Sequence, residues 1–571
     1  MTTERRRALL VVGALVAFTA TRLALVWRFP PHMDEGLFAH WAQLGYEDPA
    51  QRFLPLASGN TPMQEWLGMS LISIGIEPLT SLRVLSLLSG LVLLAVVWSL
   101  ARELGGTPAA VASLLVWVVL PFSLVYGVIG LTDPIVAACF GVALVLQLRL
   151  VRKPRLDTAL VLGIVWGIGL LTKLTMTSSL WLAPLGLLVF DWRRESLASR
   201  LARWIATLLL AGAIAAALYQ VLRLSPLYEG ADEARDLYFS NHGIREFLDS
   251  PGTWIEGNWT SYRLAYRGYL TVPLVLAGAV GAGLAIRRKP ALGLFFVGWA
   301  TLPVLAIVAL ADGAYVRWLY LPIAPLVALV SVGLAEIAAF VHRLLSDATP
   351  TVRTAVVVAT VLVLVLPAIV WDLGTLRDPV GRVYPGHDDV DYVRDFSAGG
   401  PWPAVARMLE TVPGSARVAT TGQGFDYLEV RMRTRPLAFE DVGTSVPAPM
   451  FVFGIENKHV LRRGPGVLSW RTLEVFPRPR GGVPVRVRDR VVALPAGDVA
   501  DSPSRLEALL GGHRALVRFV ALHPEVRLWA RAWRRAHGVG VAAAAASSDA
   551  AGLFRGSAEP AVSRPGSGRA S

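Results

Sequence analysis

Apolar residues recur along the first 375 residues of the chain in long runs, with short polar segments between them. A run of about twenty residues lets one α-helix cross a hydrocarbon core about 30 Å thick. The runs lie near 8–27, 80–100, 108–127, 134–150, 157–172, 175–190, 204–223, 270–286, 291–311, 317–341 and 354–372. The pattern predicts an α-helical polytopic membrane protein with about eleven transmembrane helices.

Two shorter patterns occur in the first long polar segment, 28–79. Between Leu37 and Leu44 the apolar residues, Trp41 among them, follow helical spacing. This is typical of a short helix that lies in the membrane interface. Residues 63–76 show a similar pattern, so we expect two helices in this loop.

The composition changes after the last apolar run. The pattern over 401–412 predicts a helix, and residues 416–420 and 483–494 are rich in strand-forming residues with turn residues between them. Together they indicate a small α/β domain near 376–500. The final residues are rich in Ala, Ser, Gly and Pro, which is typical of disorder. The predicted units are a membrane domain over 1–375, an α/β domain over 376–537 and a disordered tail over 538–571.

Basic residues explain both the net charge and the expected orientation. The chain is 54% hydrophobic and 17% charged, with a net charge of +13. Arginine-rich gaps between apolar runs occur at Arg5–Arg7, Arg152–Lys153, Arg193–Arg194 and Arg287–Lys289. The positive-inside rule places all of them in the cytoplasm and needs no nucleic-acid partner. The loops 28–79 and 224–269, and everything after residue 373, are then expected on the extracytoplasmic face.

Cys139, the only cysteine, excludes an intramolecular disulfide and a cysteine-ligated metal site.

The segment HMDEGLFAHWAQ, residues 32–43, places two carboxylates directly after the first apolar run. One interpretation is structural: Asp34 caps a helix, and Glu35 complements its dipole. The other is chemical: Asp34 is a general base at the membrane surface that takes a proton from an attacking hydroxyl. The two interpretations are compatible, because a capping aspartate is also held rigidly.

Three further charged residues are expected on the same face. Asp133, followed by a proline, is a good helix start. Lys173 ends an apolar run, where a lysine commonly reaches toward the headgroups. Arg317 opens a predicted inward-running helix, where the helix dipole disfavours a cation, and Asp312 is a candidate partner. A chemical interpretation gives both cations one task, the binding of a phosphate at the bilayer edge.

Metal-binding patterns are weak. Asp389 and Asp391 form a D-x-D pair, but on the side where nucleotide sugars are scarce. His32 and His40 lie near the acid pair without a thiolate or a strong ligand spacing. No cofactor is indicated with certainty, and a divalent metal stays open.

In this order the motifs resemble those of the GT-C membrane glycosyltransferases, in particular the protein O-mannosyltransferase and lipid A aminoarabinose transferase group (glycosyltransferase family 39). They are DExxxA at Asp34, Glu35 and Ala39, a TDP turn that starts at Thr132–Asp133, G-x-LTK ending at Lys173, RWLYLP from Arg317 to Pro322, and an outer C-terminal domain. The resemblance covers about residues 1–375. It implies a sugar donor on a polyprenyl phosphate.

The resemblance also implies roles for individual residues. Asp34 is expected to be the base with Glu35 in support, and Asp133 to line the acceptor or sugar pocket. Lys173 and Arg317 are expected to hold the donor phosphate. Relatives often carry a KPP-type motif later in the first loop, whereas this chain has GNTPMQEW with Thr61 in place of the lysine. His32, and Asn60 and Glu65 of this loop, are further pocket candidates.

The expected function is transfer of a sugar from a lipid-linked donor to an extracytoplasmic protein, lipid or glycan acceptor. A transporter or flippase of lipid-linked sugars is an alternative, although transporters place ionisable residues in mid-span, and here the acids gather on one face. A non-catalytic member of the fold is a third possibility.

Overall fold

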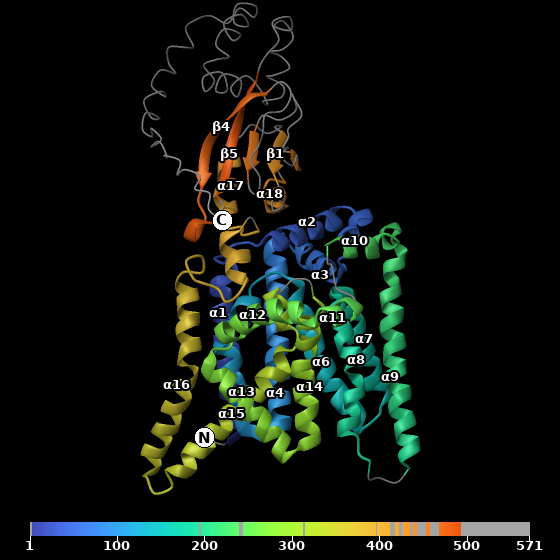
Figure 1. The fold of residues 1–571 in the computed structure, drawn as a ribbon, viewed down its shortest axis with the longest axis vertical. Helices are drawn as coiled ribbons and strands as arrows, with labels where there is room; N and C mark the ends of the chain where they lie inside the picture. The colour runs from blue at the N-terminus through green and yellow to red at the C-terminus, as the bar shows by residue number, and fades with distance from the viewer. Residues whose placement is uncertain are drawn as a thin grey trace, which may run out of the picture.

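The protein consists of a helical bundle with a small mixed sheet at one end (Figure 1). It is seen in a computed structural model, which describes residues 3–192, 196–238, 244–311, 315–395, 397–410, 417–421, 426–433, 438–441, 453–456, 467–482 and 484–492. The N-terminus lies at the end of the bundle away from the sheet, and we call the opposite end, which carries the sheet, the sheet end. The predicted tail over 538–571 and the end of the predicted α/β domain lie outside the described residues.

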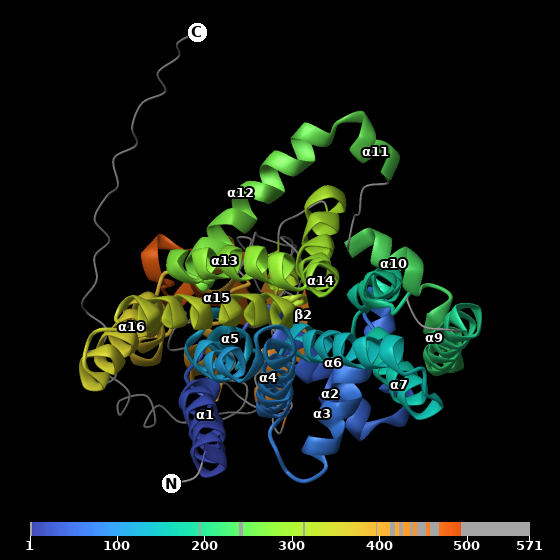
Figure 2. The same cartoon turned by 90° about the horizontal axis from the view of Figure 1, so that it is seen from below.

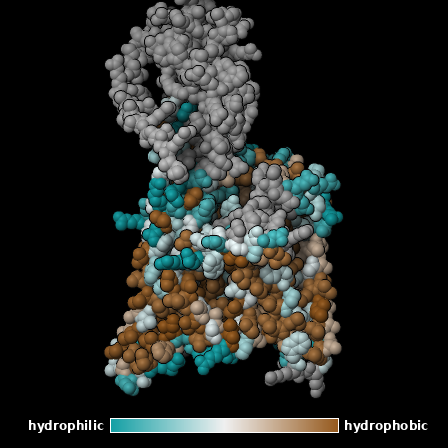
Figure 3. Space-filling model, viewed as in Figure 1, coloured by the Kyte–Doolittle hydropathy of each residue, from teal (hydrophilic) through white to brown (hydrophobic). Residues whose placement is uncertain are grey.

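The α-helices of the first 377 residues are α1 Thr3–Val26, α2 Met33–Glu47, α3 Met63–Ile72, α4 Pro78–Val119, α5 Pro121–Tyr126, α6 Thr132–Arg152, α7 Leu156–Thr172, α8 Thr177–Trp181, α9 Leu197–Tyr219, α10 Ala231–Tyr238, α11 Ile244–Asp249, α12 Pro251–Tyr269, α13 Val272–Arg288, α14 Pro290–Leu310, α15 Ile323–Leu344 and α16 Pro350–Arg377. On the face shown in Figure 3, an apolar belt crosses the bundle between two polar ends. The chain is therefore a multi-pass membrane protein.

Seven helices within the described part of the chain are long and apolar enough to cross a membrane, and the bent pair α12–α13 makes up to eight. Helix α4 has 42 residues, about 63 Å at the helical rise, and is interrupted at Gly106, where φ is +70°. Its two arms correspond to two of the predicted spans. A left-handed φ of this kind favours glycine, so the sequence permits the break.

Two predicted spans differ in detail from the structure. Residues 175–190 form a 3₁₀ turn, the short helix α8 and a second 3₁₀ segment, Ala183–Val189, instead of one helix. Pro184 lacks the N–H that a continuous helix needs. The span expected over 317–341 starts later, because a 3₁₀ helix, η7 Val316–Tyr320, precedes α15.

Two helices in the first loop are confirmed. Helices α2 and α3 lie at the sheet end, beneath the sheet domain and across the ends of the long helices (Figure 1). The seven buried residues of α2 include Phe38 and Trp41, which face the bundle. The amphipathic pattern in the sequence therefore fixes which face of α2 points inward.

The sheet domain follows α16. Its elements are the single π-helical turn η8 Val390–Arg394, α17 Trp402–Leu409, α18 Asp426–Arg431, β1 Arg417–Thr421, β2 Ala438–Asp441, β3 Phe453–Glu456, β4 Val467–Phe476 and β5 Val485–Val492. The strand order is β2-β1-β3-β5-β4, parallel within β2-β1-β3 and antiparallel from β3 to β4. Trp402 and Leu428 of the helices pack with Val418 and Val487 of the sheet in a separate core. The α/β character of this region and its helix and two predicted strands are confirmed.

The sheet domain is docked along the whole length of α2. In order from the start of α2, the contacts are Met33 N–H to the Ser397 carbonyl (2.9 Å), Gly36 against the Tyr427 backbone, His40 Nε2 to Glu429 Oε2 (3.2 Å) and an ion pair of Glu47 with Arg433. A Cβ atom at Gly36 would lie 3.0 Å from the Tyr427 nitrogen, so glycine permits this close approach of α18. One helix is thus held between the bundle and the sheet domain (Figure 2, seen from below, shows α2 and α3 beside α4).

The positive-inside pattern predicts that the sheet end is extracytoplasmic, and cysteine labelling in a Cys139→Ser background tests this. Cysteines at the exposed positions Ala57 and Glu229 should react with a membrane-impermeant thiol reagent in intact cells. A cysteine at Ser199, exposed at the opposite end of the bundle, should react only after permeabilisation. Labelling of position 199 in intact cells, with none at 57, would reverse the orientation.

Candidate functional site

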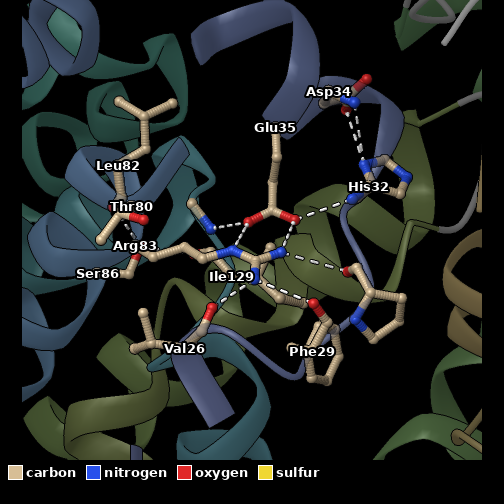
Figure 4. Close-up of polar contacts among 12 residues, drawn as sticks. Val26, Phe29, His32, Asp34, Glu35, Thr80, Leu82, Arg83, Ser86 and Ile129 are labelled. Carbon is tan, nitrogen blue, oxygen red and sulfur yellow. Dashed lines mark hydrogen bonds and ion pairs between the residues drawn. The ribbon is translucent and has the colours of Figure 1, made fainter. Parts of the chain in front are cut away.

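Helix α2 begins with a capping box that the sequence analysis did not identify. His32 is the N-cap: its Nδ1 accepts a hydrogen bond from Asp34 N–H (3.2 Å), and its own N–H donates to Glu35 Oε2 (2.9 Å). The interpretation of Asp34 as the helix cap is therefore wrong, because Glu35 reaches back to His32 and the helix begins one residue before Asp34. The Asp34 carboxylate lies in the first turn and is not used for capping (Figure 4).

Glu35 is fully buried and ion-paired with Arg83 of α4 (Figure 4). Arg83 donates through Nε to Oε1 and through Nη2 to Oε2, both at 2.9 Å, and Gly130 N–H donates to Oε1 at 2.6 Å. With the bond from His32, each carboxylate oxygen of Glu35 accepts two hydrogen bonds. Both oxygens of Glu35 are therefore occupied. Glu35 acts on Asp34 only indirectly, by anchoring the first turn of α2.

Arg83 completes this anchor and was missed in the sequence. Its Nη1 donates to the carbonyls of Val26 (2.6 Å) and Phe29 (3.0 Å), at the end of α1. The planar guanidinium therefore joins α1, α2 and α4 at one point. A signal was present, since Arg83 lies inside an apolar run near the end that the positive-inside rule depletes of arginine.

Four of the predicted charged residues come together at the sheet end, and we call them the ion cluster: Asp34, Asp133, Lys173 and Arg317. Arg317 Nη1 forms an ion pair with Asp34 Oδ2, and Lys173 Nζ donates to Asp133 Oδ1 at 2.7 Å. The two pairs interact electrostatically with each other. Their side chains are 5% to 21% exposed, so the cluster is reached from solvent but only in part.

The four residues of the ion cluster come from four separate elements. Asp34 and Asp133 lie in the first turns of α2 and α6, where the helix dipole stabilises a carboxylate. Lys173 is the C-cap of α7, in extended conformation. Arg317 lies in η7 and not at the start of the long helix, which corrects the expectation that it opens the inward-running span. The candidate partner Asp312 lies outside the described residues.

The cluster sets the protonation state of Asp34. Burial alone would raise the pKa of its carboxyl, but Arg317 above all, with His32 and Lys173, lowers the pKa below its usual value. Asp34 is therefore ionised in this state, and it is held by a cation. Two acids of the sheet domain, Asp391 of η8 and Asp426 of α18, lie within electrostatic range of Asp34.

The other pocket candidates differ in position. His32 is 6% exposed, its Nδ1 lies 4.0 Å from Asp34 Oδ2, and its ring meets that of Tyr392 edge-on at 5.0 Å. Asn60 donates to Ser58 Oγ within its own loop (3.0 Å). Glu65 is buried in α3, and burial raises the pKa of its carboxyl to about 8. Of these three candidates, only His32 has a contact with the ion cluster among the described residues.

The D-x-D pair is divided between different partners. Asp389 pairs with Arg394 (2.9 Å) and with Arg480, whereas Asp391 lies 3.8 Å from His387. No three His, Cys, Asp or Glu side chains in the described segments come together in an arrangement that holds a metal ion. The adjacent Asp388 is buried and accepts hydrogen bonds from Tyr126 (3.1 Å) and Tyr269 (2.5 Å), which no sequence pattern predicted.

Comparison with known proteins gives the fold a name. Residues 59–219 match the family model of the dolichyl-phosphate-mannose-protein mannosyltransferases. ArnT from Cupriavidus metallidurans superposes with a TM-score of 0.51 in the apo state and 0.53 with undecaprenyl phosphate bound. In both comparisons the identity is 15%, over 85% of this chain and 98% of ArnT. The chain has the GT-C fold of the protein mannosyltransferase and ArnT type.

A second solved GT-C structure is more distant. The Archaeoglobus fulgidus oligosaccharyltransferase in complex with Zn and sulfate is 13% identical over 78% of this chain and 67% of that one, with a TM-score of 0.50. No curated protein sequence matches the chain significantly. The family match contains Asp133 and Lys173, whereas Asp34 and Arg317 lie outside it. Their role in this GT-C protein is therefore argued from geometry.

The Glu35–Arg83 anchor should dominate the stability of the sheet end. Arg83→Met leaves a buried carboxylate without a partner, which costs about 3–5 kcal/mol. The midpoint of thermal unfolding in detergent should fall strongly, and the double variant Glu35→Gln/Arg83→Met should recover most of the loss. Arg155→Met, which breaks an exposed pair with Asp157, is the control and should leave the midpoint unchanged. Equal midpoints for Arg83→Met and the control would contradict the anchor.

The contact between α2 and α18 should depend on pH through two groups of opposite sign. Burial, and then Asp426, raises the pKa of Glu429 from 4.5 to about 7. Burial, and then Arg433, lowers the pKa of His40 from 6.5 to about 4. The stability that Glu429 contributes is present below pH 4.5 and is lost as pH rises through 7. The contribution of neutral His40 is present above pH 6.5 and is lost as pH falls through 4.

Variants separate the two contributions. The unfolding midpoint of the natural chain minus that of Glu429→Gln should fall between pH 4.5 and 7. The same difference for His40→Gln should rise between pH 4 and 6.5. Differences that stay flat with pH in both variants would show that this interface does not titrate.

Proposed function

We propose that the chain is a membrane glycosyltransferase that moves a sugar from a polyprenyl-phosphate donor to an acceptor hydroxyl or amine on the extracytoplasmic face. The observation that supports this is the ion cluster: a carboxylate base candidate, a second carboxylate and two cations converge from four elements at the sheet end of the bundle. With the sheet end at one surface of the membrane, this is the depth at which the phosphate of a membrane lipid lies. A soluble sugar donor would not require a site at the bilayer edge.

The residues have complementary tasks in such a reaction. Asp34 accepts the proton of the acceptor as its oxygen or nitrogen attacks the anomeric carbon. Arg317 and Lys173 stabilise the negative charge that develops on the departing phosphate. Asp133, paired with Lys173, orients that ammonium and borders the sugar pocket, together with His32.

The membrane side of the site offers room for a lipid chain. An apolar cavity of about 250 Å³ lies between α3, α4, α6 and α7 and is lined by Leu67, Leu85, Leu88, Ile135, Ala138 and Val142, among others. Ile135, which lines the cavity, belongs to α6, the helix whose first turn carries Asp133. This supports a donor whose phosphate is held by the cluster while its prenyl chain lies against the bundle. The bound undecaprenyl phosphate named for ArnT supports the same class of donor.

Replacement of Asp34 by Asn tests the base. Because His32 is the cap, Asp34→Asn leaves the start of α2 intact, and we expect loss of transfer by at least about 100-fold, the scale of general-base catalysis, with an unchanged unfolding midpoint. The assay is product formation by purified protein in detergent, over a panel of polyprenyl-phosphate sugars and acceptors. The control is Asp48→Asn, a carboxylate-to-amide change at the other end of α2 that also keeps a cap, since Asp48 accepts from Ala50 N–H.

The assay also separates the enzyme from a transporter. Detergent removes closed compartments, so a transporter has no gradient to report, while a transferase still forms product. Absence of product across the panel would favour a flippase of lipid-linked sugars or a non-catalytic protein. Full activity of Asp34→Asn would remove Asp34 from the role of base.

A further inference from the structure

Both cations of the ion cluster are occupied by carboxylates of the chain itself. Arg317 pairs with Asp34, and Lys173 pairs with Asp133. The proposed function requires the same Arg317 to hold a phosphate and the same Asp34 to take a proton. In the state described here these two tasks block each other, since a carboxylate that neutralises a guanidinium is a weak base.

The geometry of the Asp34–Arg317 pair allows an exchange of partners. The contact joins one nitrogen, Nη1, to one oxygen, Oδ2, and does not use the two-pronged fork of which arginine is capable. Arg317 Nε is buried and has no hydrogen-bond partner among the described residues. The guanidinium also lies over the ring of Tyr315, 4.9 Å from its centroid, which holds its plane in place. A phosphate with several charged oxygens can engage more of this fork than Asp34 does.

Acids of the sheet domain favour the same exchange. Asp391 of η8 and Asp426 of α18 interact electrostatically with Asp34, as does Lys173. Burial raises the pKa of both acids, to about 6 for Asp426, so once a phosphate neutralises Arg317 each acid that is ionised remains a negative neighbour of Asp34. Like charges make a carboxylate more basic, so the surroundings are arranged to activate Asp34 as soon as Arg317 is taken away.

We propose that the donor phosphate displaces Asp34 from Arg317, so that the base becomes competent only when the donor is bound. The inference rests on the proposed function and adds to it an order: the donor binds first, and the acceptor is deprotonated afterwards. In the transfer step the acceptor O–H or N–H bond breaks, and its proton goes to Asp34. The acceptor atom bonds to the anomeric carbon, and the electron pair of the breaking carbon–oxygen bond stays on the phosphate held by Arg317 and Lys173.

The cycle closes by reversal of the exchange. When the polyprenyl phosphate departs, Asp34 gives its proton to solvent and pairs with Arg317 again. An enzyme without donor thus keeps its base neutralised, and the cluster is electrically balanced both before and after the reaction. This explains why the base and the phosphate ligand are direct neighbours instead of lying on opposite sides of a pocket.

The test is the affinity of the purified full chain for undecaprenyl phosphate, measured by calorimetry in detergent. If the phosphate must displace Asp34, removal of that carboxylate removes the competition, and Asp34→Asn should bind the lipid about tenfold more tightly although it transfers no sugar. The control Asp48→Asn should bind like the natural chain. Arg317→Ala should lose most of the affinity.

Proton counting gives an independent readout. Binding measured in two buffers of different ionisation enthalpy, near pH 5, should show net proton uptake by the natural chain, because Asp34 becomes more basic when it is released. Asp34→Asn should show less uptake.

The lipid phosphate shares its chemistry with free phosphate, so inorganic phosphate at the same concentration serves as a second probe and should bind far more weakly without the prenyl chain.

The outcomes are distinguishable from a failure of the proposed function. Tight binding by the natural chain with an unchanged or weaker affinity in Asp34→Asn overturns the exchange and leaves the transferase intact. Absence of lipid binding together with absence of transfer overturns the donor assignment and the exchange with it. Tighter binding by Asp34→Asn than by Asp48→Asn supports the exchange.

Discussion

The buried ion pair of Glu35 and Arg83 is the interaction on which the geometry of the site depends. Two charges removed from water are tolerated only when their hydrogen-bonding capacity is filled, and here it is: Glu35 accepts four hydrogen bonds, and Arg83 also donates to backbone carbonyls at the end of α1. The pair joins α1, α2, α4 and the turn before α6. Because Asp34 is the neighbour of Glu35, its position follows from this network.

The sheet domain completes the support of α2 from the other side. It meets the helix at its first turn, in its middle and at its end, and Gly36 allows a close backbone approach that a larger residue would prevent. A helix held on two faces along its length has little freedom to tilt. This gives the domain a physical part in the site, since the first turn of α2 presents Asp34 to Arg317.

The ion cluster is only partly exposed to solvent, with side chains that are 5% to 21% exposed. Charges in such a place interact strongly, because solvent screens them only in part. In the absence of ligand the charges of two carboxylates and two cations cancel, and this makes the partial burial of the four side chains tolerable. The same balance means that any anion that enters must redistribute the pairs, which connects the stability of the resting state with the chemistry proposed for the site.

Much of this protein is determined by the sequence alone. The apolar runs predicted the membrane bundle, the helical spacing of Phe38 and Trp41 predicted α2, and the change after residue 375 indicated the sheet domain. Hydrophobic periodicity is a local property, and local properties can be obtained from neighbouring residues. The charged residues Asp34, Asp133, Lys173 and Arg317 were also singled out, because all four lie at the ends of apolar runs on the expected extracytoplasmic face, apart from the arginine-rich gaps.

Pairing is what only the tertiary structure decided. A capping role was one of two interpretations of Asp34, but His32 and Glu35 form the capping box instead. Arg317 meets Asp34, 283 residues away in the chain, a pairing that the sequence did not suggest. Arg83 received no role from its position in an apolar run, and Asp391 and Asp426 reach Asp34 only through the docking of the sheet domain. The sequence determines which residues carry charge and which face of a helix is apolar. The partner of a charge depends on how helices from distant parts of the chain pack, and no local pattern encodes that.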